Sequence, residues 1–201
     1  MNSPECHYNV IQQTPEWEML KLGKFSGSDY HIYLGTSKTK EDNLYDIAAQ
    51  RITGDSDNES VFKSKAMERG NILEPEARRV FSAIIEHNIR EVGFVDCAGE
   101  FYGWAGCSPD GLIGDNGIIE IKCPLMKGFL KYKRTKKIDP QYKTQIQFNL
   151  MVTERQYCYF IVYHPRFPIE YVKIERDEDV INKIRESLKE NIEKVKKICQ
   201  D

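Results

Sequence analysis

Apolar residues recur every three or four positions in three long segments of the chain, residues 41–53, 66–84 and 179–199. This period places them on one face of a helix, so each segment is predicted to be an amphipathic helix. Pro75 falls inside the second segment and is expected to kink that helix or to restart it. The polar stretch TGDSDNES, residues 53–60, is predicted to be the loop between the first two helices.

From residue 91 the pattern changes to short apolar runs separated by turn residues. The runs EVGFVD, FYGWAGC and GIIEIKC, at 91–96, 101–107 and 117–123, are predicted to be three consecutive strands. The last run follows Asp-Asn-Gly, which is a strong hairpin signal because Asn-Gly favours the positive φ angles of tight turns. The third strand is therefore expected to leave a tight turn.

The second half of the chain adds a helix and two strands before the last helix. Asp139 followed by Pro140 is typical of a helix start, and that helix is expected to continue through QYKTQIQFNLMV. The runs QYCYFIVYH and IEYVKIE, at 156–164 and 169–175, are predicted strands. This order of elements predicts one α/β (α+β) domain over residues 1–201, with a central mixed β-sheet flanked by helices.

Composition agrees with a single globular domain. Of the 201 residues, 40% are hydrophobic and 30% are charged, which supplies a sizeable core. No apolar run reaches about 18 residues, so no membrane-spanning segment is expected, and the N-terminus lacks the pattern of a secretory signal. The six cysteines include no Cys-x-x-Cys pair, which favours reduced thiols in a cytoplasmic protein over a metal knuckle.

The formal net charge of −2 does not by itself indicate a nucleic-acid binder, but basic residues gather in one segment. Between Lys122 and Lys143 lie six further Lys and Arg residues, opposed only by Asp139. Such a stretch is either a solvated face or a track for a phosphate backbone, and the sequence leaves both interpretations open.

Two opposite charges interrupt the apolar strand at 117–123. Glu120 and Lys122 point to one side of it, and a hairpin brings Asp110 of the Pro-Asp-Gly turn close to them. Half-buried carboxylates must be compensated. Mg²⁺ suits this set, with the backbone carbonyl of Ile121 as a further ligand and Lys122 beside the reacting phosphate. Glu-x-Lys alone would equally fit a solvent-facing pair on an edge strand.

Asp, ten positions, then Glu-x-Lys resembles the PD-(D/E)xK nuclease signature. The segments CSPDGL and IEIKCP resemble the lambda exonuclease family, also called YqaJ-like viral recombinases. Further similar segments follow in the family's order: WEMLKLGKFSGSD (17–29), ERGNILEPEARRVF (68–81), YKTQIQFNLMVT (142–153), YFIVYHPRF (159–167) and VKIERDE (172–178).

The resemblance implies a restriction-endonuclease-like core and a Mg²⁺-dependent 5′→3′ exonuclease on linear double-stranded DNA, with Mn²⁺ able to substitute. The expected product is a 3′ single strand, which a separate single-strand annealing protein pairs during phage-type recombination. A ring-shaped homotrimer enclosing DNA is also implied. If the chain is encoded by a phage or prophage, its place is the cytoplasm of a bacterial host.

The resemblance also implies roles for individual residues. It assigns metal binding to Asp110, Glu120, Ile121 and Glu74, catalysis to Asp110, Glu120, Lys122 and Gln145, and contacts with DNA or its 5′-phosphate to Lys21, Ser28, Ser108 and Tyr142. The family usually has an arginine at the position of Lys21. Lysine keeps the charge and loses the bidentate fork, so Lys24 is a candidate to supplement it.

Several alternatives stay open at this point. Glu74 fits a solvent-facing helix position, Tyr142 a core contact, Lys21 a solvated surface position, and Gln147 could take the place of Gln145. His164 is expected to be structural. The chain could also be a restriction-type endonuclease, a RecB-like nuclease module or a DNA-end-binding protein without activity.

Overall fold

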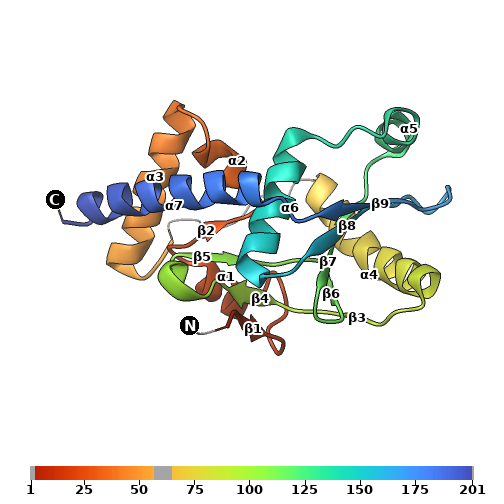
Figure 1. Cartoon of the computed structure of the whole chain (residues 1–201), viewed down its shortest axis with the longest axis horizontal. Coiled ribbons are helices and arrows are strands. Elements are labelled where there is room, and N and C mark those ends of the chain that lie inside the picture. The colour runs from red at the N-terminus through yellow and green to blue at the C-terminus, as the bar shows by residue number, and fades with distance from the viewer. Residues whose placement is uncertain (1–2, 57–64, 201) are drawn as a thin grey trace.

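The computed structural model describes residues 3–56 and 65–200, and the second half of the predicted loop at 53–60, residues 57–60, lies outside them. The described strands form two mixed sheets (Figure 1). The five-stranded sheet has the order β3 (Ile89–Arg90), β6 (Gly111–Ile113), β7 (Gly117–Lys122), β8 (Tyr157–Val162) and β9 (Glu170–Glu175). The four-stranded sheet has the order β1 (Glu5–His7), β4 (Phe94–Asp96), β5 (Ala105–Cys107) and β2 (Phe25–Ser26).

Each sheet contains one parallel pair. In the larger sheet β7 and β8 run parallel, while β3–β6, β6–β7 and β8–β9 are antiparallel. In the smaller sheet β2 and β5 run parallel. The predicted class, helices around mixed β-structure, is confirmed, and the strands are divided between two sheets because the short early strands pair among themselves.

The helices cover the sheets from both sides. They are α1 (Pro15–Lys21), α2 (Tyr30–Tyr33), α3 (Lys38–Thr53), α4 (Lys65–Ile85), α5 (Met126–Thr135), α6 (Pro140–Thr153) and α7 (Glu178–Ile198), with a 3₁₀ turn, η1, at Gly99–Phe101. The three helices predicted from periodicity correspond to α3, α4 and α7, with ends within three residues of the prediction. The helix α4 continues through Pro75, so of the two expected effects, a kink or a restart, the restart does not occur.

Two buried clusters hold this arrangement together. On one face of the larger sheet, Ala77 and Phe81 of α4 pack on Ile119, Ile121 and Ile161. The other cluster joins both sheets through α6 and includes Val95, Ala105, Ile118, Phe148, Phe160 and Leu188. Burial of this much apolar surface is the main stabilising term of such a domain, and it makes α6 the shared wall between the two sheets.

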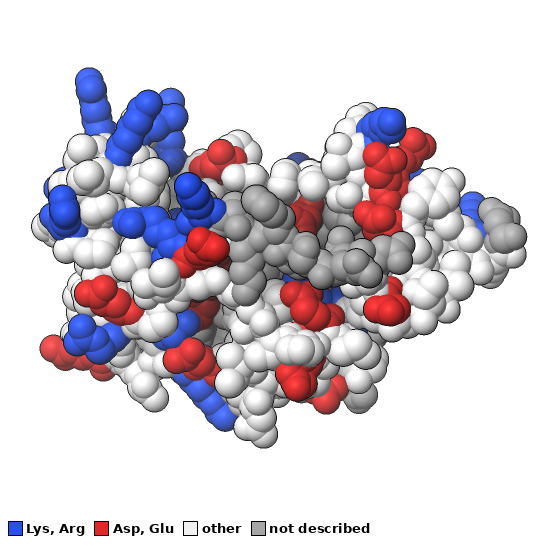
Figure 2. Space-filling model, turned by 180° about the vertical axis from the view of Figure 1, so that it is seen from behind, with Lys and Arg blue, Asp and Glu red and all other residues white. Residues whose placement is uncertain are grey.

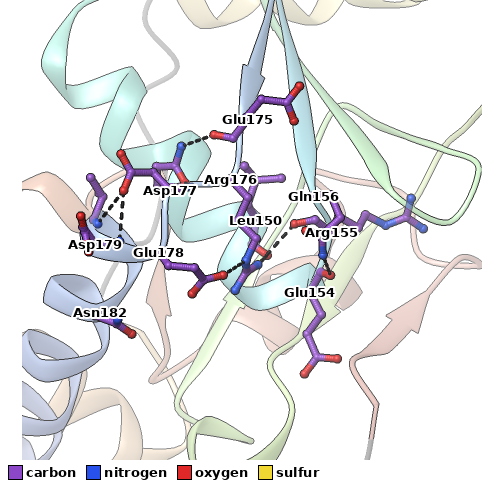
Figure 3. Close-up of polar contacts among 12 residues, drawn as sticks. Leu150, Glu154, Arg155, Gln156, Glu175, Arg176, Asp177, Glu178, Asp179 and Asn182 are labelled. Atoms are coloured by element: carbon purple, nitrogen blue, oxygen red, sulfur yellow. Dashed lines mark hydrogen bonds and ion pairs between the residues drawn. The ribbon is translucent and has the colours of Figure 1, made fainter.

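The helix α6 is fixed at both ends by polar contacts. Asp139 caps its start by accepting a hydrogen bond from the Gln141 N–H at 3.1 Å, as the sequence predicts. At its other end Arg176 donates to the carbonyl of Leu150 at 2.5 Å and pairs with Glu178 (Figure 3). These contacts tie α6 to the corner between β9 and α7.

Some predicted elements differ from the structure. Residues 101–107 form a strand only at Ala105–Cys107, after the 3₁₀ turn η1. The strands β1, β2, β3 and β6 are two or three residues long and were not predicted, because so short a run carries no period. The helices α1, α2 and α5 were also missed. Within the described residues, no helix combines the length and the apolar character needed to cross a membrane.

All six cysteines are free thiols. Cys97, Cys107 and Cys158 are buried, in agreement with the expectation of buried reduced thiols, whereas Cys199 is exposed. Burial raises the pKa of the Cys97 thiol to about 12, so it is protonated and packs as a small apolar side chain.

Candidate active site

The hairpin of β6 and β7 brings Asp110 against the charged end of β7. The Asp110 N–H donates to the Ile119 carbonyl at 3.2 Å, and the Ile121 N–H donates to the Asp110 carboxylate at 2.5 Å. Lys122 Nζ lies 2.7 Å from Glu120 Oε1. The structure therefore brings together the three residues on which the sequence interpretation depends.

The pair Glu120–Lys122 is not on an edge strand. The strand β7 lies between β6 and β8, and Glu120 is only 2% exposed. The side chain of Lys122 is 28% exposed, and its Nζ lies 4.7 Å from the ring centroid of Tyr142. The alternative of a solvent-facing pair is wrong, because a carboxylate at this depth is removed from water and held by its partners.

The backbone of Ile121 also faces the site. Along a strand the N–H and C=O of one residue point to the same edge. Since the Ile121 N–H points to Asp110, its carbonyl is directed to that side as well, beyond Gly111, the first residue of β6. An oxygen at this position is suited to a cation held by the neighbouring carboxylates.

Glu74 approaches this group from α4 and is half-buried rather than solvent-facing. Burial raises the pKa of Glu74, and although Lys122 acts in the opposite direction, Glu120 adds to the increase. Arg78, one turn further along α4, donates to the backbone oxygen of Asp110 at 2.8 Å. The helix is thus hydrogen-bonded to the turn that carries the first carboxylate.

Together these residues hold more negative than positive charge. Burial raises the pKa of Asp110 well above its usual range, and Glu120 and Glu74 raise it further. Burial acts to lower the pKa of Lys122, but Glu120 and Asp110 outweigh it and keep that pKa above its usual value. Three carboxylates around one ammonium fit a divalent cation, which would supply the missing positive charge through oxygen ligands.

Tyr142 and Gln145 lie one turn apart on α6, the helix that reaches the site through Tyr142. Gln145 is half-buried, and Tyr142 packs on Phe160, with ring centroids 5.9 Å apart, while facing Lys122. Tyr142 is therefore both a core contact and a neighbour of the site. Gln147 does not replace Gln145, because its side chain is buried and bonded to the backbone of Glu175 and Asp177 at 2.9 Å each.

Lys21 and Ser108 are linked through a residue that the sequence interpretation did not single out. The Trp17 indole N–H donates to Ser108 Oγ at 2.7 Å, and Lys21 Nζ lies 3.8 Å from the centroid of the same indole. Ser28 is exposed and bonds to Ser26 Oγ at 3.0 Å. The structure thus joins Lys21 and Ser108 through Trp17, whereas the contacts of Ser28 are with Ser26 and Asp29.

Lys24 does not supplement Lys21. Its Nζ lies 2.5 Å from the buried carboxylate of Asp96, to which His7 also bonds at 3.0 Å. Ligand atoms of Glu5, His7 and Asp96 lie within 4.8 Å of one another. Because Lys24 already balances Asp96, this group is a filled polar network between β1 and β4.

The basic segment forms an exposed surface. Four residues of α5 are exposed: Lys127, Lys131, Lys133 and Arg134. Lys and Arg side chains gather at the upper left of Figure 2, the corner of the molecule where α5 lies (Figures 1 and 2). Residues 123–125 connect β7 directly to α5, so this surface begins next to Lys122. Lys133 pairs with Glu170 at 3.9 Å.

Sequence reasoning missed Trp17, Arg78 and Asn149. Asn149 Nδ2 lies 3.5 Å from Glu120 Oε2. All three fall inside segments that resemble the family, and a Trp four positions before Lys21, about one helical turn, was the available signal for the first. No spacing in the sequence connects Arg78 with Asp110 or Asn149 with Glu120, since both contacts depend on tertiary packing.

His164 agrees with the structural role expected for it. It is buried and packs on Phe167, with ring centroids 5.1 Å apart, and its Nδ1 accepts a hydrogen bond from the Arg166 N–H at 3.2 Å. Burial lowers the pKa of its imidazole, which favours the neutral form.

Comparison with solved structures gives two close matches with one exonuclease. The chain is similar to the alkaline exonuclease LHK-Exo from Laribacter hongkongensis, at 30% identity and a TM-score of 0.83, covering 93% of this chain and 95% of that one. The complex of LHK-Exo with dAMP matches at 31% identity and a TM-score of 0.84, with the same coverage. A phage-related exonuclease from Haemophilus somnus 129PT shares the fold at 17% identity and a TM-score of 0.63, covering 88% of this chain and 95% of that one.

Comparison with curated protein sequences finds no match. The profile of the YqaJ-like viral recombinase domain, in contrast, matches residues 16–156, a range that contains every candidate site residue named above. The match to LHK-Exo extends over almost the whole of both chains and agrees with the restriction-endonuclease-like core expected from the sequence. The chain therefore belongs to the YqaJ-like viral recombinase family.

Proposed function

We propose that this protein is a divalent-metal-dependent exonuclease that digests linear double-stranded DNA from its 5′ ends and leaves 3′ single strands. The observation that carries the proposal is the convergence of Asp110, Glu120 and Glu74 on the single ammonium of Lys122. Buried carboxylates with raised pKa values are typical of sites built to hold a cation or to transfer protons.

In this proposal Asp110, Glu120, Glu74 and the carbonyl of Ile121 hold Mg²⁺, for which Mn²⁺ can substitute. A bound divalent ion neutralises charge on the phosphate and makes a water nucleophilic near neutral pH. Lys122 stays protonated beside Glu120 and stabilises charge that develops on the scissile phosphate. Gln145 borders the same space from α6 and orients the attacking water or the phosphate.

DNA would approach along two surfaces. The basic surface of α5 would contact the phosphate backbone, which supplies most of the affinity of sequence-independent binding. Lys21, Ser28 and Ser108 would hold the terminal 5′-phosphate, with Tyr142 beside the strand. Charge-assisted hydrogen bonds to phosphate fix such an end in register.

The relatives support the class of reaction. LHK-Exo is named an alkaline exonuclease and has been crystallised with dAMP, a mononucleotide such as an exonuclease acting on DNA would release. The family name links the domain to recombination. We extend the proposal to a homotrimer around the DNA, to a single-strand annealing protein as partner, and to the cytoplasm of a bacterial host.

The proposal is tested by incubation with Mg²⁺ and matched linear or covalently closed circular duplex, each DNA end being labelled in turn. Linear DNA should lose 5′-terminal nucleotides and keep long 3′ strands, whereas closed circles should remain intact. Cutting of closed circles at discrete positions would instead indicate a restriction-type endonuclease. Binding of ends with no nucleotide released would indicate a DNA-end-binding module.

A further inference from the structure

Asn149 is a buried amide between the candidate metal site and the N-terminal loop that carries the serines. It lies on α6, is 2% exposed, and has the apolar neighbours Phe148 and Leu150 on either side in the sequence. A buried amide needs hydrogen-bond partners, because an unpaired polar group loses its contact with water without compensation. The surroundings of Nδ2 and Oδ1 therefore indicate the role of Asn149.

The amide nitrogen faces Glu120. Nδ2 lies 3.5 Å from Glu120 Oε2, while Lys122 occupies Oε1 at 2.7 Å. Each oxygen of the Glu120 carboxylate thus has its own hydrogen-bond donor. Such an arrangement fixes the plane of the carboxylate, and a carboxylate fixed in this way is preorganised for a metal ion.

The amide oxygen faces Gly27. Oδ1 is buried and has no hydrogen-bond partner among the described residues. A Cβ atom added at Gly27 would lie 2.2 Å from it and 3.3 Å from the backbone oxygen of Gln145. The loop from Ser26 to Ser28 can therefore approach α6 this closely only because residue 27 has no side chain.

We propose that Asn149 is a positioning residue that couples the terminal-phosphate loop to the metal-binding carboxylate Glu120. Through Nδ2 it orients Glu120, and through Oδ1 it sets the distance between α6 and the loop that presents Ser28. This inference rests on the proposed function, and it adds a residue that links two parts of the site. A shift of the loop on binding a 5′-phosphate is then transmitted to the carboxylate through one side chain.

The test compares Asn149→Ala with Gly27→Ala and with the double variant. The matched control is Thr153→Val, which removes the 2.7 Å hydrogen bond from Thr153 to the Asn149 carbonyl, on the same buried helix and without touching Glu120. Mg²⁺ binding is measured by calorimetry without DNA, and initial rates are measured on 5′-phosphorylated and 5′-hydroxyl duplexes. Thermal unfolding reports the stability of each variant.

Asn149→Ala should weaken Mg²⁺ binding about tenfold, as loss of an outer-shell partner typically does, and should reduce the ratio of rates on phosphorylated and hydroxyl ends. Gly27→Ala should cause both losses, because its Cβ displaces the Asn149 amide. Adding Asn149→Ala to Gly27→Ala should cause little further loss, since contacting residues are not additive. Thr153→Val should lower the melting temperature and leave both other measurements unchanged.

The positioning role is overturned if Asn149→Ala binds Mg²⁺ as the wild type does and keeps the phosphate preference, with only its melting temperature lowered. Additive effects of Gly27→Ala and Asn149→Ala would also overturn it. Failure of the proposed function looks different: the wild type itself would then bind no Mg²⁺ and release no nucleotides. Wild-type binding with an unchanged variant therefore rejects the role of Asn149 alone.

Discussion

The guanidinium Nε of Arg78 lies 2.8 Å from the backbone oxygen of Asp110. Arg78 follows Glu74 by one turn of α4, so this hydrogen bond joins the helix of one candidate metal ligand to the turn of another. Arg69, five residues before Glu74, donates to the carbonyl of Cys123 at 3.1 Å. The two arginines attach α4 to both sides of the charged strand end, which keeps Glu74 in place.

Removal of the hydrogen bond from Arg78 to the Asp110 backbone should weaken the binding of Mg²⁺. In Arg78→Ala, we expect the Mg²⁺ concentration that gives half-maximal cleavage to rise about tenfold, because a hydrogen bond to a charged group contributes about 1.5–3 kcal/mol. The rate at saturating Mg²⁺ should fall less. Cleavage rates across a Mg²⁺ titration measure both effects.

The control for this change is Glu91→Gln. Glu91 pairs with Arg78 at 2.9 Å, but its side chain is 73% exposed, and exposed ion pairs contribute little. Glu91→Gln should therefore leave the Mg²⁺ requirement unchanged. If Arg78→Ala also leaves it unchanged, the bond between α4 and the Asp110 turn does not position Glu74.

How far the sequence predicts this site depends on how local each contact is. Asp110, Glu120 and Lys122 lie on one hairpin, so strand alternation and a turn signal were sufficient to place them together. Glu74 comes from a separate helix, and only the family resemblance indicated it. Asn149 could not be predicted, because its role depends on Gly27, which is distant in the sequence and recognisable only from the close approach of two backbones.

The elements of the fold were likewise predictable where their sequence signal is local, and not where they depend on tertiary pairing. Long helices such as α7 have a clear 3.6-residue period, and their ends were predicted within three residues. Strands such as β2 and β3 have two residues each, so their conformation is decided by the strands with which they pair. The helix α5 was missed because its many charged residues suggested a solvated or DNA-facing segment and left its conformation unassigned.

Asp110→Asn and Glu120→Gln should each abolish cleavage while leaving DNA binding largely intact. Both substitutions keep the shape of the side chain and remove a charge that the cation requires, whereas phosphate contacts elsewhere supply most of the affinity. Nucleotide release and fluorescence anisotropy with labelled duplex measure the two properties. Asp115→Asn, at the exposed tip of the same hairpin, is the control and should keep full activity.

Near-wild-type cleavage by either carboxylate variant in Mg²⁺ would show that the metal site lies elsewhere. Loss of binding together with cleavage would show that these residues hold the DNA rather than the ion.

The stability of the metal-free protein should fall as the pH rises. Burial raises the pKa of Asp110 and of Glu74, whereas unfolded carboxyl groups titrate near about 4. Between that value and the raised folded pKa, the folded protein binds more protons than the unfolded chain, so raising the pH favours unfolding. Thermal unfolding in EDTA from pH 5 to pH 9 measures this dependence.

Asp110→Asn provides the comparison for this pH dependence. It should unfold at a higher temperature than the wild type at pH 8 without metal, because one buried charge is gone, and its melting temperature should vary less with pH. Mg²⁺ should stabilise the wild type more at pH 8 than at pH 5, since binding requires deprotonated ligands. A variant less stable than the wild type at pH 8 in EDTA would contradict this account.

The basic surface of α5 should contribute to DNA affinity in a salt-dependent way. Replacing Lys127 and Lys131 by Ala should reduce the slope of log affinity against log salt by about one for each phosphate contact that is lost. The cleavage rate at saturating DNA should stay close to that of the wild type. The control is Lys196→Ala on α7. In the wild type, Lys196 pairs with Glu193 at 2.7 Å. An unchanged slope in the double variant would assign α5 to the solvated surface.

The Nζ of Lys21 lies 3.8 Å from the centroid of the Trp17 ring and 3.9 Å from Glu18 Oε2. Stacking on the indole directs the ammonium while leaving it available to a phosphate. The wild type should therefore digest 5′-phosphorylated ends faster than 5′-hydroxyl ends. Lys21→Ala should remove most of that preference, a loss of about tenfold, because a charge-assisted hydrogen bond contributes about 1.5–3 kcal/mol.

Two further variants separate charge from stacking at this position. Lys21→Arg should keep the phosphate preference and can strengthen it, because the guanidinium stacks on the same ring and binds phosphate with two parallel hydrogen bonds. Glu18→Gln should change little, since at 3.9 Å on an exposed helix its ion pair with Lys21 is weak. Initial rates on matched ends decide the question. If wild type and Lys21→Ala prefer phosphorylated ends equally, Lys21 is a solvated lysine on α1 and the terminal phosphate is held by other residues.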